Sequence, residues 1–235
     1  MLRADGLTRD YGRTRALLDV SFHVPAGQTV ALLGANGAGK STLLNILAGV
    51  LSPTSGTATV VGVELPRDRR RIGAMVGFVP QGESLYRELT VSENVRFFAR
   101  SHGVSRADIG RRLPAVLERM GLADRGDQRA GTLSGGLRQR AAIAASLLHE
   151  PRVLLLDEPT TGLDPVAREK LLDLLSDLTR QEDTKRCVLM CTHDVHDAAR
   201  VANRALVLVG GRLVHDSPGI DEAALSAAFR QEAPA

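Results

Sequence analysis

A glycine-rich segment near the N-terminus has the residue types and spacing of a phosphate-binding loop. Residues 34–41 read GANGAGKS, which matches the pattern G-x-x-x-x-G-K-[ST]. Glycines leave backbone N–H groups free to approach phosphate oxygens, and the N-terminus of a following helix adds positive partial charge. A lysine at this place suits the β- and γ-phosphates of a nucleotide, and a serine hydroxyl suits Mg²⁺. The predicted phosphate-binding residues are Gly34, Asn36, Gly37, Gly39, Lys40, Ser41 and Thr42.

Two adjacent carboxylates follow an apolar run in the second half of the chain. Residues 153–156 predict a buried strand, and Asp157 and Glu158 come directly after it. Open parallel sheets bind their ligands at the carboxyl ends of the strands. Asp157 is suited to bind Mg²⁺, directly or through water, and Glu158 to polarise an attacking water. Alone this motif is weak, because many strands end in acidic residues, but together with loop 34–41 it predicts nucleotide hydrolysis.

A third motif, LSGG at residues 133–136, precedes another predicted helix. It places the hydroxyl of Ser134 and the side-chain-free amides of Gly135 and Gly136 at a helix N-terminus, where a second phosphate can bind. An ordinary helix cap followed by a flexible turn explains this motif equally well when it is taken alone.

The elements that must position these motifs alternate between strands and helices. This alternation predicts an α/β fold with a parallel-sheet core. The strands are predicted at 18–24, 29–33, 75–79, 153–157, 186–191, 205–209 and 212–214, with a strand-rich piece at about 56–63, and the core helices at 41–48, from 164 to about 180 and from about 195.

Between about 84 and 150 the pattern becomes mostly helical. Thr90 and Ser105 each precede an acidic residue by three positions, the spacing of a capping box. Pro114 either lies inside the second of these helices or ends it. We therefore predict a single domain over 1–235, with an α/β core at about 1–84 and 151–216, a helical subdomain at about 85–150 and a short C-terminal helix at about 219–231.

The composition limits the class of protein. Thirty basic and 27 acidic side chains give a net charge of +3, a surplus too small to indicate a nucleic-acid partner, and none is expected. No apolar stretch reaches the ~18–20 residues that a membrane helix needs, and the N-terminus has no signal-peptide pattern. Any membrane role therefore requires a partner that spans the bilayer. Cys187 and Cys191 are too far apart along one strand for a disulfide and are expected to be buried thiols.

The order of the motifs resembles that of ABC-type ATPases over nearly the whole chain. After loop 34–41 come Gln81 behind the next core strand, the LSGG motif, Asp157-Glu158, the run 162–164 and His193. The resemblance implies a P-loop NTPase fold whose parallel-sheet core carries an antiparallel β subdomain and an inserted helical subdomain. It also implies an enzyme that binds ATP with Mg²⁺ and hydrolyses ATP.

The resemblance assigns roles to single residues within one chain. Tyr11 would stack on adenine, with an ordinary surface tyrosine as the alternative. Glu158, Gln81 and His193 would be catalytic, acting on the attacking water and the γ-phosphate. The residues that would hold Mg²⁺ are Ser41, Gln81 and Asp157.

Other roles involve a second ATPase chain, identical or related. Ser134, Gly135 and Gly136 would close over the γ-phosphate of the opposite chain's ATP, and Asp164 would link the two sites across the dimer. The motif departs from the family at Leu137, where glutamine is usual. The phosphate-facing serine and glycines are intact, so binding across the dimer is expected, whereas the contacts of that glutamine are absent.

For the biological role, the resemblance implies an ATPase subunit at the cytoplasmic face of a membrane, powering a separate membrane-spanning permease. Segment 84–98 is similar to subunits of drug-, polysaccharide- and haem-export systems, which favours export. Two alternatives stay open: a soluble ABC-type ATPase acting on a protein scaffold, as in iron–sulfur assembly, and the ATPase of an importer. The sequence does not name a transported substrate.

Overall fold

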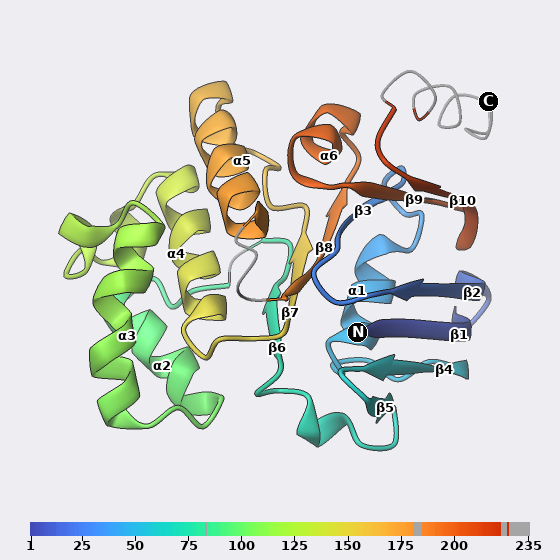
Figure 1. The fold of residues 1–235 in the computed structure, drawn as a ribbon, viewed down its shortest axis with the longest axis horizontal. Coiled ribbons are helices and arrows are strands. Elements are labelled where there is room, and N and C mark those ends of the chain that lie inside the picture. The colour runs from blue at the N-terminus through green and yellow to red at the C-terminus, as the bar shows by residue number, and fades with distance from the viewer. Residues whose placement is uncertain (83, 181–184, 222–224, 226–235) are drawn as a thin grey trace.

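Two β-sheets organise the chain (Figure 1). The computed structural model describes residues 1–82, 84–180, 185–221 and 225. The larger sheet has the order β10 (Arg212–Pro218), β9 (Arg204–Val209), β3 (Thr29–Leu33), β8 (Cys187–Thr192), β7 (Val153–Asp157), β6 (Val76–Val79). The smaller sheet has the order β2 (Thr14–Val24), β1 (Leu2–Tyr11), β4 (Ser55–Val60), β5 (Val63–Leu65).

Strand direction distinguishes the two sheets. From β9 to β6 every neighbouring pair of the larger sheet is parallel, and only its edge strand β10 pairs antiparallel, with β9. The smaller sheet is antiparallel throughout. The predicted α/β class, with a parallel core and an antiparallel β part, is therefore confirmed.

The helices cover the faces of the larger sheet and form a block at one side of it (Figure 1). Their bounds are α1 (Lys40–Leu47), α2 (Val91–Ser101), α3 (Arg106–Arg119), α4 (Gly135–Leu147), α5 (Pro165–Arg180) and α6 (Val195–Val201), with short 3-10 turns η1 (Arg69–Arg71), η2 (Ala123–Arg125) and η3 (Ala130–Thr132).

The apolar core lies on both faces of the larger sheet because side chains alternate along its strands. Leu155 of β7 and Leu189 of β8 face a cluster that includes α1 and the smaller sheet. Leu154 and Met190, their neighbours along the same strands, face a second cluster that includes α2–α5. α1 therefore lies between the two sheets, and this packing fixes the start of α1 beside the strand ends.

The predicted helix starts in the block α2–α4 are largely confirmed. Thr90 forms a complete capping box with Glu93. Ser105 caps α3 by accepting from Asp108 N at 3.1 Å, but its hydroxyl donates to the Asp108 carboxylate, so the box is not reciprocal. α3 continues through Pro114, because the buried side chains on either side of it pack into the helical cluster.

The last part of the chain contains the predicted hairpin β9–β10, with both Gly210 and Gly211 at positive φ in the turn. Cys187 and Cys191 are free, buried thiols on β8, as predicted. The C-terminal helix predicted at about 219–231 lies mainly outside the described residues. Among those that are described, no helix has the length and hydrophobicity needed to cross a bilayer.

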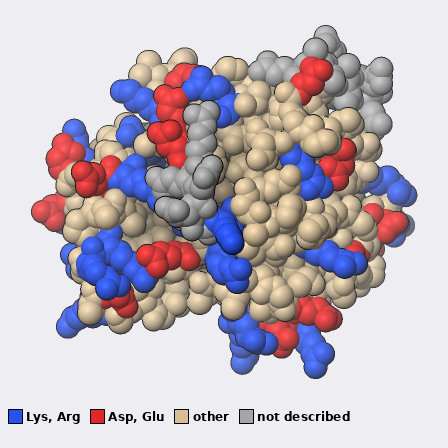
Figure 2. All heavy atoms as spheres, viewed as in Figure 1, with Lys and Arg blue, Asp and Glu red and all other residues tan. Residues whose placement is uncertain are grey.

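Charged side chains of both signs are interspersed on the face of the molecule drawn in Figure 2. The net charge of +3 is therefore not gathered into one basic patch on this face.

Candidate active site

Four loops that carry predicted site residues leave the same edge of the larger sheet. Strands β6, β7, β8 and β3 are parallel neighbours, so their carboxyl ends lie side by side. Gln81 follows β6, Glu158 follows β7, His193 follows β8 and the loop 34–39 follows β3. The order of neighbours in the sheet, and not the order in the chain, brings these residues together.

The glycine-rich loop packs closely against the rest of the core before it enters α1. Gly39 has a φ of 106°, which a residue with a side chain rarely adopts, and a Cβ there would collide with the carbonyl oxygen of Ala16. Gly39 offers no side chain to cap α1, so the first N–H groups of the helix are left for a ligand. The pocket around this loop is lined by Ala16, Asn36, Gly37, Ala38, Gly39, Lys40, Ser41, Thr42, Gln81 and Glu158.

Lys40 and Glu158 form a buried ion pair at the floor of this pocket. Lys40 Nζ lies 3.0 Å from Glu158 Oε1, and the two side chains are 5% and 4% exposed. The ammonium also donates to the carbonyl oxygens of Gly34 at 2.6 Å and Ala35 at 3.2 Å. Lys40 therefore has its partners inside the chain, and a phosphate must compete with Glu158 for it.

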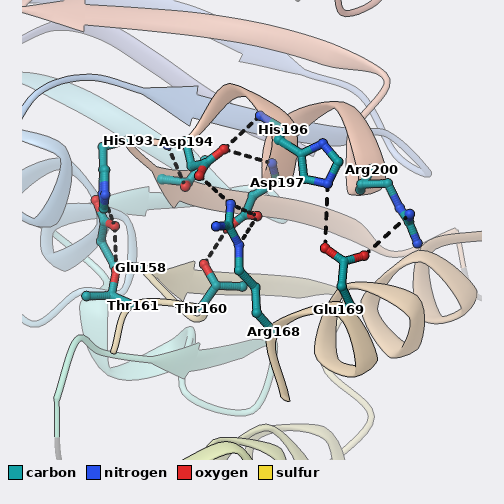
Figure 3. Close-up of polar contacts among 11 residues, drawn as sticks. Glu158, Thr160, Thr161, Arg168, Glu169, His193, Asp194, His196, Asp197 and Arg200 are labelled. Carbon is teal, nitrogen blue, oxygen red and sulfur yellow. Dashed lines mark hydrogen bonds and ion pairs between the residues drawn. The ribbon is translucent and has the colours of Figure 1, made fainter. Parts of the chain in front are cut away.

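The second oxygen of Glu158 contacts two further residues (Figure 3). His193 Nδ1 lies 2.7 Å from Glu158 Oε2, and the Thr161 hydroxyl donates to the same oxygen at 2.9 Å. The His193 side chain is 51% exposed, so its ring connects the buried carboxylate to the surface. Glu158 is thus held by three side chains: Lys40 at the start of α1, Thr161 of its own loop after β7, and His193 of the loop after β8.

The two adjacent carboxylates have pKa values shifted in opposite directions. Burial raises the pKa of Asp157; the Ser41 hydroxyl opposes this effect, and the Glu158 carboxylate adds to it. Burial also disfavours ionised Glu158, but Lys40, Thr161 and His193 outweigh it and lower the pKa of that group. Glu158 is therefore an anion at neutral pH, whereas Asp157 holds its charge less readily.

Glu158 also has an unusual backbone. Its φ is 51°, in the left-handed region that costs a residue with a side chain about 1–2 kcal/mol. The turn directs the carboxylate back toward Lys40 instead of continuing the strand direction. This strain is stored at the residue whose position matters most for the predicted chemistry.

A second hollow lies on the other side of the carboxylates. Its lining includes Gln81 of the loop after β6, Gly135 at the start of α4, and Glu158. Ser134 and Gly135 are exposed, whereas Gly136 is buried against α5, where a Cβ would lie 2.7 Å from the Cβ of Ala167. Ser134, Gly135 and Gly136 are all absent from the described residues that line the pocket around loop 34–39.

Two more predicted residues, Tyr11 and Asp164, are not among the described residues that line the pocket around loop 34–39. Tyr11 ends β1, is 47% exposed and has the Arg9 guanidinium 4.7 Å from its ring centre. Asp164 is exposed and caps α5 by accepting from Ala167 N at 3.0 Å. The structure thus unites Lys40, Ser41, Gln81, Asp157, Glu158 and His193 but not Tyr11, and of the residues expected to face a second chain it leaves Ser134, Gly135 and Asp164 exposed and buries Gly136.

Sequence reasoning missed several residues of this site. Thr160 and Thr161 follow Asp157-Glu158, and two hydroxyls at a strand end were the available signal. Ala16 lines the pocket because the β1–β2 hairpin approaches loop 34–39, and no sequence pattern indicates such a contact. Arg168 was missed as well; its contacts lie 26 and 29 residues further along the chain.

Comparison with known proteins identifies the family. A family profile described as "ABC transporter" matches residues 17–161. A Bacillus subtilis relative named as an uncharacterized ABC transporter ATP-binding protein is 39% identical over 213 residues, which are 91% of this chain and 69% of the relative. The chain belongs to the ABC transporter family. It is an ATP-binding ATPase subunit of that family.

Other relatives of this ABC ATPase carry more specific names. The Nod factor export ATP-binding protein I of Ralstonia nicotianae is 39% identical over 214 residues, which are 91% of this chain and 66% of the relative. The protein of the same name from Rhizobium meliloti is 39% identical over 208 residues, covering 88% and 61%. The chain spans between 59% and 69% of the length of these and similar curated relatives.

Solved structures agree with the family in fold. A dimeric ATP-binding cassette in a post-hydrolysis state with ADP and Pi has a TM-score of 0.80 and 29% identity, covering 93% of this chain and 98% of its own. A subunit from Clostridium perfringens, part of an ABC transporter complex, has a TM-score of 0.83 and 28% identity, covering 97% and 92%. The P-loop NTPase fold predicted from the sequence is therefore confirmed.

Proposed function

We propose that this ABC ATPase hydrolyses MgATP between two chains and thereby powers a separate membrane-spanning permease, in the direction of export. The observation that carries the proposal is the division of the site. Lys40, Asp157 and Glu158 are buried together in one chain, while Ser134 and Gly135 lie exposed at the start of a different helix. Each set offers groups suited to phosphate, and none of Ser134, Gly135 and Gly136 lines the pocket that contains Lys40.

Within one chain, ATP binding changes the partner of Lys40. The γ-phosphate competes with Glu158 Oε1, which lies 3.0 Å from the ammonium. When Lys40 turns to phosphate, Glu158 loses the cation that lowers its pKa, so the carboxylate becomes a better base at the moment when water must be polarised. His193 and Thr161 keep the carboxylate in place while this exchange happens.

The donor set around Asp157 fits Mg²⁺. Asp157 Oδ1 is buried and has no hydrogen-bond partner among the described residues, and the Ser41 hydroxyl lies beside the carboxylate. With the amide of Gln81, these residues offer the oxygen ligands that Mg²⁺ prefers. When bound, the ion supplies positive charge to the phosphate oxygens. It also favours the ionised form of a carboxylate that burial disfavours.

The second chain supplies the remaining donors. The Ser134 hydroxyl and the first N–H groups of α4 are positioned to bind a γ-phosphate presented by a partner chain. Asp164, at the start of α5, lies on the run 162–164 that the same partner covers. The dimeric form of the similar ATP-binding cassette with ADP and Pi supports this arrangement. Tyr11, exposed on β1, is the residue we assign to adenine stacking.

The contact with the permease is assigned to an aromatic cluster formed by exposed Tyr86 and Phe97 and half-buried Phe98. Tyr86 and Phe97 are 49% and 45% exposed, and their ring centres are 5.0 Å apart. These residues belong to segment 84–98, downstream of Gln81, so a helix docked there lies close to the loop after β6. The names of the Nod factor export relatives support export as the direction of transport. Because the partner spans the membrane, we place the chain at the cytoplasmic face of that membrane.

The division of the site is tested by dilution of the purified chain. As the chain is diluted, its ATPase rate per chain is expected to fall, and light scattering is expected to report a shift from dimer to monomer over the same range of concentration. A rate that stays constant in a species shown to be monomeric would remove the two-chain mechanism.

The membrane role is tested by purification of the native complex. A membrane-spanning chain is expected to copurify, and Phe97→Ala is expected to reduce transport while the isolated ATPase keeps its rate. A complex made only of soluble proteins would replace transport by action on a protein scaffold, and uptake by reconstituted vesicles would replace export by import.

A further inference from the structure

Arg168, in the first turn of α5, bridges to two carboxylates around the start of α6 (Figure 3). Its Nε donates to Asp197 Oδ1 at 2.7 Å, and its Nη2 contacts the same oxygen at 2.5 Å. The same Nη2 also pairs with Asp194 Oδ2. The other oxygen of Asp197 accepts from the Thr160 hydroxyl at 2.5 Å, so this carboxylate joins Arg168 to the loop after β7.

Burial of Asp197 makes the loss of its partner in this bridge costly. Asp197 is 1% exposed, and the Arg168 and Asp194 side chains are 30% and 34% exposed. A buried carboxylate needs a charged partner, and two carboxylates that share one guanidinium repel each other when it is removed. Burial on its own would raise the pKa of Asp194, but the hydrogen bond and charge of Arg168 lower it.

The bridge ends beside His193. Asp194 is the next residue, and its backbone N–H donates to the Thr192 hydroxyl at 3.0 Å. Its carboxylate also caps α6 by accepting from His196 N at 2.8 Å. The backbone on both sides of His193 is therefore fixed, and the ring reaches Glu158 Oε2 at 2.7 Å from this support.

The other end of the bridge belongs to the run 162–164. Asp164 caps α5, and its carbonyl oxygen accepts from Arg168 N at 2.9 Å. This hydrogen bond and the Asp164 cap connect the run to the first turn of α5, which carries Arg168. Thr160 and Thr161 lie at the entrance of the same run, one bound to Asp197 and the other to Glu158.

We propose that Arg168 is a positioning residue that holds His193 against Glu158 and links this contact to the run 162–164. The inference rests on the proposed function, because it assumes that Glu158 and His193 act in hydrolysis and that a second chain covers the run. When a second chain covers the run 162–164, the first turn of α5 is held in place. Arg168 in turn holds the loop after β8, which carries His193.

The same pair of helices offers a matched control. Arg200 of α6 pairs with Glu169 of α5 at 3.5 Å (Figure 3) and with Asp173 of α5 at 2.5 Å. These side chains are 41–62% exposed and lie away from His193. Arg200→Gln therefore removes ion pairs between α5 and α6 without touching the bridge, and its ATPase kcat is expected to stay within about 2-fold of the unmodified chain.

The experiment is a double-mutant cycle between Arg168→Gln and His193→Ala in the full chain, read as kcat and KM for ATP. Arg168→Gln is expected to lower kcat roughly 10-fold or more, the scale of lost charge-assisted hydrogen bonds, with KM nearly unchanged. In the His193→Ala background the same change is expected to lower kcat by less than about 2-fold. Equal losses in both backgrounds would mean a merely structural role and would overturn the inference.

Asp194→Asn is the second variant in case Arg168→Gln melts too early to be assayed. Asparagine still caps α6 but gives up the charge that pairs with Arg168, so kcat is expected to fall, and Tm is expected to fall less than in Arg168→Gln, which leaves two carboxylates without their cation. An unchanged kcat in Asp194→Asn would overturn the inference. Full turnover in Glu158→Gln would instead overturn the proposed chemistry, so the two failures are distinguishable.

Discussion

The N-termini of α1 and α4 both carry glycine-rich motifs, but their surroundings differ. Lys40, at the start of α1, is 5% exposed and paired with buried Glu158. Ser134, at the start of α4, is exposed, and its hydroxyl accepts a long hydrogen bond of 3.4 Å from Leu137 N. The first helix end is surrounded by ionised partners from its own chain, whereas the second directs neutral donors to solvent.

This difference explains how one chain can contribute its α1 end to one ATP site and its α4 end to another. The charged groups, Lys40 and Glu158, are already buried and held in position by packing before a ligand binds. Neutral donors at a helix end can stay exposed because water satisfies their hydrogen bonds at little cost in free energy. They are therefore available to bind a ligand presented by a second chain. The following substitutions test whether the two ends act in this way.

Removal of the Glu158 charge is expected to have the largest effect. Glu158→Gln keeps the shape of the side chain but cannot accept a proton, so kcat should fall by about 10²–10⁴-fold. Binding of ATP should persist, because Lys40 and the loop amides are intact. Single-turnover hydrolysis and equilibrium binding measure the two quantities separately.

Thr161→Val is the control for that substitution. It removes a single hydrogen bond to the same carboxylate, at 2.9 Å, and should reduce kcat by less than about 10-fold. Turnover by Glu158→Gln that approaches the rate of Thr161→Val would exclude Glu158 as the general base.

The exposed end is tested by mixing two inactive variants. Lys40→Ala disables the α1 end, and Ser134→Arg blocks the α4 end with a bulky side chain. Random pairing of two chains makes about half of the dimers mixed, each with one intact site, so activity should return to roughly a quarter of that of the unmodified chain. A variant that keeps full activity alone would contradict the assignment of its helix end.

Asp157→Asn is expected to stabilise the nucleotide-free chain while reducing its activity. Burial raises the pKa of Asp157, so its ionised form opposes folding at neutral pH. Replacement by asparagine should raise Tm by about 2–4 °C, the shift that about 1 kcal/mol gives in a chain of this size.

The pH dependence of this gain follows from the sign of the shift. The unfavourable contribution is present above the raised pKa and disappears as the pH falls through it, so the Tm difference should shrink in acid. Asp164→Asn, at an exposed cap where asparagine also serves, should leave Tm unchanged. A lower Tm for Asp157→Asn at pH 7 would contradict the prediction.

The smallest effect is expected at Leu137, where the family usually has glutamine. Leu137 is half-buried against the helical cluster, while Gln139 lines the hollow beside Gly135. Leu137→Gln should therefore change kcat by less than about 3-fold and lower Tm by about 2 °C through lost apolar burial. A much faster turnover, by about an order of magnitude, would show that the departure at this position limits the enzyme.

The core of the fold was predictable because its strands are short, apolar and followed by motif residues. Strand β1 was not, because register shifts near Ala4, Leu7 and Arg9 disturb its alternation, and Gly6 adopts a positive φ. The path of α3 through Pro114 was left open, because tertiary packing of Leu113 and Leu117 decides it.

The site was predictable where a motif is contiguous. Lys40, Ser41, Asp157 and Glu158 lie together as their motifs suggest, although their individual roles stay predictions. The Lys40–Glu158 pair spans 118 positions, from 40 to 158, and depends on the order of strands in the sheet. The bridge from Arg168 to Asp194 and Asp197 also needs α5 and α6 to pack side by side, which no local pattern specifies.

The left-handed backbone of Glu158 has a consequence for directed evolution. At this position glycine would relieve a strain of about 1–2 kcal/mol but would leave the buried Lys40 without its carboxylate, whereas at Asp157 loss of charge relieves a desolvation penalty. A library selected only for survival of heating should therefore enrich substitutions at Asp157, a residue assigned to the chemistry, while Glu158 is retained in spite of its strained backbone. Heat-resistant variants of this chain would accumulate as inactive folds unless turnover is selected in the same round.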